Sequence, residues 1–133
     1  MFIMDSGAMS WSAKNQPIIA LSTTEGEYIA ATHAAKEAAW ICEIFNKIGQ
    51  PFSTPTTLFC DNQSAITLTK DGQYLVHMKH ISTQYHFISE MVEKSIIALT
   101  YCPTTTMVVD ALTKALPHGT FKSLMHKLGL CLA

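Results

Sequence analysis

The chain has 133 residues, of which ten are acidic and nine basic, for a net charge of −1 with histidine neutral. This length suits a single domain, residues 1–133, whose core needs no disulfide support. All nine basic residues are lysines, so the chain offers no guanidinium fork for phosphates and lacks the basic surface of an autonomous nucleic-acid-binding protein. No window approaches the roughly 18 uninterrupted apolar residues of a membrane span, so we expect a soluble protein without a membrane partner.

The four cysteines have no CxxC spacing, and three of them, Cys42, Cys60 and Cys102, lie in apolar runs. That pattern is typical of buried free thiols in a reducing compartment.

The N-terminal part predicts β structure. Short apolar runs at residues 2–4, 8–12 and 18–21 predict two or three strands, with turns at residues 5–7 and around Pro17. A long helix follows over residues 24–48, where apolar side chains recur at spacings of three and four.

The rest of the chain alternates strands and helices. Residues 56–60 predict a strand, and Asn62 is the expected N-cap of a short helix that reaches about residue 70. The remaining expected elements are a helix at 79–94, a strand at 96–102, a loop at 103–106 and helices at about 107–114 and 118–128. This order predicts a mixed α/β layer fold with no internal domain boundary.

Three acidic residues occupy positions suited to metal chemistry. Asp61 directly follows a predicted strand, where open α/β sheets place their functional groups. Glu27 lies early in the long helix and Asp110 at the start of a late one. If the three carboxylates converge, they provide the oxygen ligands that Mg²⁺ or Mn²⁺ prefers.

Each acid also has a purely structural interpretation. Glu27 stands three residues after Thr24, which is the spacing of a capping box, whereas Glu25 would project to a different side of the helix and suits a metal less well. The structural interpretation of Asp61 is a cap on the next helix, although Asn62 is the better cap. Asp110 in a first helical turn is favourable on dipole grounds alone.

For two further groups of residues, the histidines and the tryptophans, we expect a role in packing rather than in function. His77, His80 and His86 have a spacing compatible with zinc, but no carboxylate or cysteine stands at ligand spacing beside them, so we assign His80 and His86 to packing or surface hydrogen bonds. Trp11 and Trp40 are expected to be buried rather than to stack on bases.

Several segments, in order along almost the whole chain, resemble the ribonuclease H domain of the copia-type long-terminal-repeat retrotransposon polyprotein. They are residues 11–17, 20–28, 60–66, 79–81, 85–88 and 110–114. The resemblance implies a ribonuclease H-like mixed sheet flanked by helices, and hydrolysis of the RNA strand of RNA·DNA hybrids. It also implies an upstream reverse transcriptase domain as a partner. The implied location is intracellular, either cytoplasmic within virus-like particles or nuclear.

Matched residue by residue, the resemblance makes Glu27, Asp61 and Asp110 the catalytic and metal-binding residues. In that family two Mg²⁺ ions, or Mn²⁺, are held by three or four carboxylates. The family's first aspartate lies on a strand that precedes the hairpin expected at residues 2–11, and we expect this chain to begin after it. Asp5 matches the hairpin turn rather than that aspartate.

The missing strand is the centre of the resembled sheet. We therefore expect a site that is inactive or weakly active, and self-association through exposed strand edges. The alternatives are a non-catalytic relic or host-adopted interaction module with the same fold, and an α/β binding module without metal chemistry.

Overall fold

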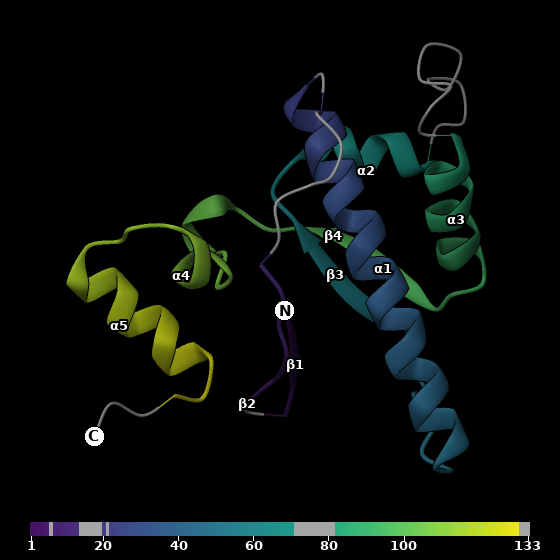
Figure 1. Cartoon of the computed structure of the whole chain (residues 1–133), viewed down its shortest axis with the longest axis horizontal. Helices are drawn as coiled ribbons and strands as arrows, with labels where there is room; N and C mark the ends of the chain where they lie inside the picture. Colours follow the sequence, from purple (N-terminus) through teal and green to yellow (C-terminus); the bar gives the residue numbers. More distant parts are fainter. Residues whose placement is uncertain (6, 14–19, 21, 71–81, 131–133) are drawn as a thin grey trace. The chain divides into compact units, whose positions relative to one another are not determined.

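The computed structural model describes residues 1–5, 7–13, 20, 22–70 and 82–130 (Figure 1). The chain divides into two compact units. The larger unit comprises residues 16–103, and the smaller one combines residues 1–15 with residues 104–133. Each unit is a mixture of short strands and helices, as the predicted α/β class requires.

The first long helix, α1, spans Thr23–Lys47. Ser22 is its N-cap: the Ser22 hydroxyl accepts a hydrogen bond from the backbone N–H of Glu25 at 3.1 Å, and Glu25 stands at the third helical position. The interpretation that pairs Thr24 with Glu27 as the capping box is therefore wrong. Gly49 ends the helix region with φ of +76°, a conformation that glycine adopts without steric cost.

The sheet of the larger unit consists of β3 (Thr56–Cys60) and β4 (Ile97–Tyr101) within its described residues. The two strands are parallel, and their register pairs Leu58 with Leu99 and Cys60 with Tyr101. Parallel strands need a crossover connection, which here contains α2 (Gln63–Lys70) and α3 (Ser82–Glu93). The carboxyl ends of both strands therefore lie at the same edge.

The core of this unit lies where α1 packs against β3, α2 and α3. Ile29 of α1, Ile88 of α3 and Ile97 of β4 are at most 1% exposed. Leu58 and Cys60 of β3 are also buried, whereas Thr57 and Phe59 on the alternate face are exposed. Figure 1 shows α1 lying across the strands, with α3 beside it. One face of the sheet is thus covered by helices.

The smaller unit contains a hairpin and two short helices. Strands β1 (Phe2–Met4) and β2 (Gly7–Ser10) are antiparallel, and Asp5 in the connecting turn has φ of +55°. Asp5 therefore belongs to a turn, as expected. Helix α4 spans Asp110–Thr113 and α5 spans His118–Lys127.

Some sequence-based boundaries differ from the structure. The helix expected at 107–114 contains only α4, and a 3₁₀ turn at Thr104–Thr106 occupies the expected loop. The strand expected at 8–12 ends at Ser10. Most of the strand expected at 18–21, and the expected first turn of the helix at 79–94, fall outside the described residues.

The expected burial of both tryptophans is wrong. Trp11 is 66% exposed and Trp40 is 60% exposed. Trp40 follows the buried Ala38 by two positions, which is about 200° around a helix of 3.6 residues per turn. It therefore lies on the face of α1 opposite the core.

Candidate functional site

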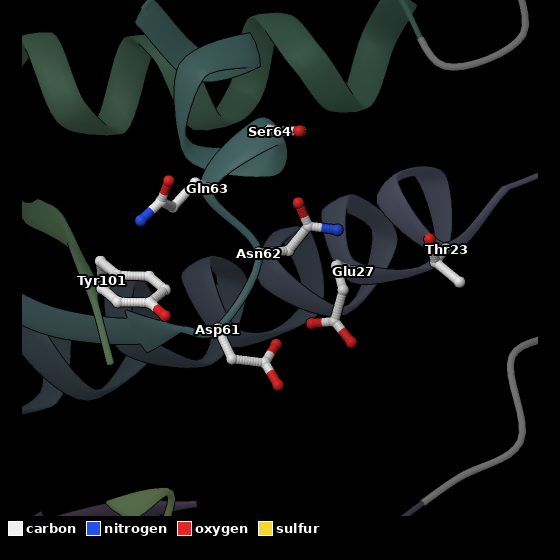
Figure 2. A pocket seen from close by; sticks show the side chains of 7 residues that line it. All are labelled: Thr23, Glu27, Asp61, Asn62, Gln63, Ser64 and Tyr101. Carbon is white, nitrogen blue, oxygen red and sulfur yellow. The ribbon is translucent and has the colours of Figure 1, made fainter. Parts of the chain in front are cut away.

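Glu27 and Asp61 meet at one open pocket in the larger unit. Its volume is about 550 Å³, and its lining residues are Thr23, Glu27, Asp61, Asn62, Gln63, Ser64 and Tyr101. Figure 2 shows both carboxylates directed toward the same side of the pocket, Glu27 from α1 and Asp61 from the loop after β3. Two of the three predicted acids thus share one site.

The position of Asp61 follows from the sheet. It comes directly after Cys60, the last residue of β3, and before α2 begins at Gln63. The helix cap comes from Asn62, whose Oδ1 accepts a hydrogen bond from the backbone N–H of Ala65 at 3.2 Å. The cap role is therefore filled by Asn62, as expected, and Asp61 lines the pocket.

The position of Glu27 follows from helical spacing. Thr23 and Glu27 are four residues apart on α1, so they lie on one face, and both line the pocket. Glu25 is 2% exposed and takes part in the helix cap, whereas Glu27 is exposed. Glu27 therefore lines the pocket, and Glu25 is not among its lining residues.

The pKa of the Cys60 thiol is shifted by the residues of the same arrangement. Burial raises the pKa of Cys60 above its ordinary value, the backbone carbonyl of Asn62 lowers it, and the carboxylates of Glu27 and Asp61 raise it further. The thiol donates to that carbonyl, with Sγ 3.6 Å from the oxygen. Both carboxylates thus disfavour ionisation of this one buried thiol.

The donors around the pocket are oxygen-rich. Besides the two carboxylates, Thr23, Ser64 and Tyr101 contribute hydroxyl groups, and Asn62 and Gln63 contribute amides. Carboxylate, hydroxyl and amide oxygens suit Mg²⁺ or Mn²⁺ rather than a soft metal. The pocket therefore fits a hard divalent cation by the chemistry of its donors.

Asp110 belongs to the smaller unit. It begins α4, and its Oδ2 lies 2.9 Å from the Nζ of Lys114, one turn later on the chain. The Asp110 side chain is only 14% exposed. Its convergence with Glu27 and Asp61 stays a prediction.

The described residues also bear on the other metal hypotheses. Within the described part of either unit, no three side chains of His, Cys, Asp or Glu gather as a metal-binding group. Of the three histidines considered for zinc, His77 and His80 fall outside the described residues, and His86 is exposed on α3. Among the helices that the structure describes, none is both long and apolar enough to cross a membrane.

Sequence reasoning missed four lining residues: Thr23, Gln63, Ser64 and Tyr101. Tyr101 reaches the site because it ends β4 in register with Cys60. This register, which the sequence alone did not indicate, brings the ends of the two strands side by side. Thr23 could have been found by counting one turn back from Glu27.

Proteins with related sequences come from plant transposons. The retrovirus-related Pol polyprotein from transposon TNT 1-94 of Nicotiana tabacum is 38% identical over 130 residues, which are 98% of this chain. The chain is homologous to part of a Pol polyprotein. The corresponding polyproteins from transposons RE2 and RE1 of Arabidopsis thaliana are 33% and 32% identical over 122 residues, or 92% of the chain.

The matched region is a small part of these relatives. The chain spans 10% of the length of the tobacco polyprotein and 8% of each Arabidopsis polyprotein. No family model matches the chain, and no solved structure matches it significantly.

Proposed function

We propose that this chain is the ribonuclease H region of a copia-type retrotransposon Pol polyprotein, and that it weakly hydrolyses the RNA strand of RNA·DNA hybrids with Mg²⁺ or Mn²⁺. The observation that carries the proposal is the meeting of Glu27 and Asp61 at one pocket beside the carboxyl end of β3. Homology to Pol polyproteins supports the retrotransposon origin. An upstream reverse transcriptase domain would be its partner in the polyprotein, inside the cell in virus-like particles or in the nucleus.

The residues have separate roles in this proposal. Glu27 and Asp61 would hold divalent cations through their carboxylates, with Asp110 as a third ligand. A bound cation in such a site supplies an activated water and stabilises the leaving oxygen. The pocket's open shape leaves room for a phosphodiester, and Thr23, Ser64 and Tyr101 offer hydroxyl groups that can hydrogen-bond to it.

The test is hydrolysis of a labelled RNA·DNA hybrid by the 133-residue chain with Mg²⁺ or Mn²⁺. Glu27→Gln, Asp61→Asn and Asp110→Asn should each reduce the cleavage rate by about 100-fold or more, because each removes a charged ligand but keeps the side-chain shape. Glu43→Gln is the matched control on α1. Glu43 is exposed and forms an ion pair with Lys47 at 2.8 Å, so its substitution should leave cleavage unchanged.

Different results would contradict different parts of the proposal. Cleavage that survives Asp61→Asn would exclude the site. If Asp110→Asn keeps full activity while the other two variants lose it, Asp110 is not a metal ligand, and the pocket with Glu27 and Asp61 remains the proposed site.

The second candidate is a non-catalytic interaction module. The ion pair between Asp110 and Lys114 favours it, because a carboxylate already paired with a cation has a stabilising role without metal. Under this alternative, the wild-type chain would bind the hybrid without cleaving it, and the three acid substitutions would not weaken binding.

A further inference from the structure

Asn62 uses both ends of its side-chain amide. Its Oδ1 accepts a hydrogen bond from the Ala65 backbone N–H at 3.2 Å, and its Nδ2 donates to Thr24 Oγ1 at 3.5 Å. Its backbone carbonyl accepts a hydrogen bond from the Cys60 thiol, whose Sγ lies 3.6 Å from the oxygen. One residue thus connects the end of β3, the start of α2 and the first turn of α1.

These contacts join the two segments that carry the acids of the pocket. Asp61 lies between Cys60 and Asn62 in the chain, so the contacts on either side of it restrict its backbone. Glu27 lies three residues after Thr24 on the rigid helix α1. The bond from Asn62 to Thr24 therefore fixes the helix that carries Glu27 against the loop that carries Asp61.

The arrangement needs the chemistry of asparagine in particular. Serine, threonine and aspartate also cap helices, but an ionised aspartate has no hydrogen to donate, and a serine side chain is shorter than that of asparagine. Among these residues only asparagine carries the acceptor for α2 and the donor for α1 on separate atoms of one longer side chain. A role limited to capping would be satisfied by any of these residues.

We propose that Asn62 is a positioning residue, which acts through Thr24 to hold Glu27 and Asp61 at the spacing that a divalent cation requires. The inference rests on the proposed function, because it assumes that the pocket binds Mg²⁺ or Mn²⁺. It extends that function by giving the Asn62 side chain, which bridges α1 and α2, a role in setting the affinity for the metal. Residues that orient metal ligands typically change metal affinity by about 10- to 100-fold when they are substituted.

The test compares variants that remove the bridge but keep the helix cap. Thr24→Val removes only the acceptor hydroxyl, and Asn62→Ser keeps a capping oxygen but shortens the side chain. Mg²⁺ is titrated into the 133-residue protein, and the dissociation constant is read from the backbone amide signals of residues 61–63 by NMR. Thermal unfolding of each variant is measured in parallel without metal.

We expect Thr24→Val and Asn62→Ser each to raise the Mg²⁺ dissociation constant about tenfold, with a change in melting temperature of only a few degrees. The double variant should be no weaker than either single variant, because both remove the same bond. Thr24→Ser retains the hydroxyl and should bind Mg²⁺ like the wild type.

The outcomes separate the two proposals. If Asp61→Asn binds Mg²⁺ as tightly as the wild type, the proposed function is overturned and the inference with it. Mg²⁺ binding that depends on Asp61 but is unchanged by Thr24→Val would overturn only the role of Asn62. A tenfold loss in Thr24→Ser as well would also contradict it, since the hydroxyl is still present in that variant.

Discussion

At the residue scale, burial raises the pKa of the Cys60 thiol, and the carboxylates of Glu27 and Asp61 raise it further. Its pKa is raised, so the folded protein favours the neutral thiol. A group whose pKa is raised by folding contributes its full stabilisation below its ordinary pKa, and this contribution is lost as pH rises through the raised value. The ordinary thiol pKa of 9.0 sets the lower end of that window.

We therefore predict that the protein loses stability as pH rises above about 9, and that Cys60→Ala flattens this loss. Urea unfolding at a series of alkaline pH values would measure it. Cys102, which lies after β4 and is less buried, provides the matched control as Cys102→Ala. An equal pH dependence in the wild type and Cys60→Ala would show that other groups cause the loss.

Lys114 supports a second prediction at the residue scale. Its ammonium group and a divalent cation would compete for the carboxylate of Asp110, which lies 2.9 Å away. The Lys114 side chain is 52% exposed, and such surface ion pairs contribute about 0.2–1 kcal/mol. Lys114→Met should therefore lower the Mg²⁺ concentration for half-maximal hybrid cleavage by about threefold.

A Mg²⁺ titration of the cleavage rate measures this shift. Lys122→Met is the control: it also removes one lysine charge from the same unit, on α5, but not the lysine that pairs with Asp110. A higher Mg²⁺ requirement in Lys114→Met would instead show that the ammonium holds Asp110 in its working orientation.

At the scale of elements, the helices and strands were largely predictable because their periodicity is local. The spacing of apolar residues predicted α1, and the β-rich runs predicted β3 and β4. The start of α1 was harder to predict, because Ser22 with Glu25 and Thr24 with Glu27 both satisfy the capping-box spacing. Only the structure shows that Glu25 is the buried member of the cap.

The cap at Ser22 gives a prediction for α1. Ser22→Ala should destabilise the protein by about 1 kcal/mol, because it leaves the N–H of Glu25 without its side-chain acceptor. Ser22→Asn retains an acceptor and should remain within a few tenths of a kcal/mol of the wild type. Urea unfolding at neutral pH would compare them, and equal stability of all three would refute the cap.

The site was predictable only in part. Asp61 and Glu27 could be selected because one follows a strand and the other follows the start of a helix. Their meeting, however, depends on the packing of α1 against β3, which no local pattern encodes. Asp110 and the expected single domain of residues 1–133 depend on how the two units fit together, so both stay predictions.

At the scale of the whole molecule, one face of the sheet of the larger unit carries exposed side chains. Thr57, Phe59 and Thr100 are exposed there, with Phe59 62% exposed. Within the described part of that unit, β3 and β4 pair only with each other, and a strand edge without a partner can recruit another chain.

We therefore predict that the protein self-associates at micromolar concentration and that Phe59→Lys shifts it toward the monomer, because an exposed lysine opposes pairing at strand edges. Analytical ultracentrifugation over a concentration series would measure the shift. Trp40→Lys, an equally large change at an exposed site on α1, is the control. A wild-type protein that stays monomeric throughout the series would exclude this interface.

The exposure of both tryptophans decides how unfolding of this molecule can be observed. Trp11 and Trp40 are already in contact with solvent in the folded state, so their fluorescence should be red-shifted before any denaturant is added and should change little in wavelength on unfolding. Tyr28, in contrast, is only 3% exposed in the core. Circular dichroism and tyrosine absorbance are therefore the signals to follow, and a flat tryptophan emission trace would not mean that the protein had remained folded.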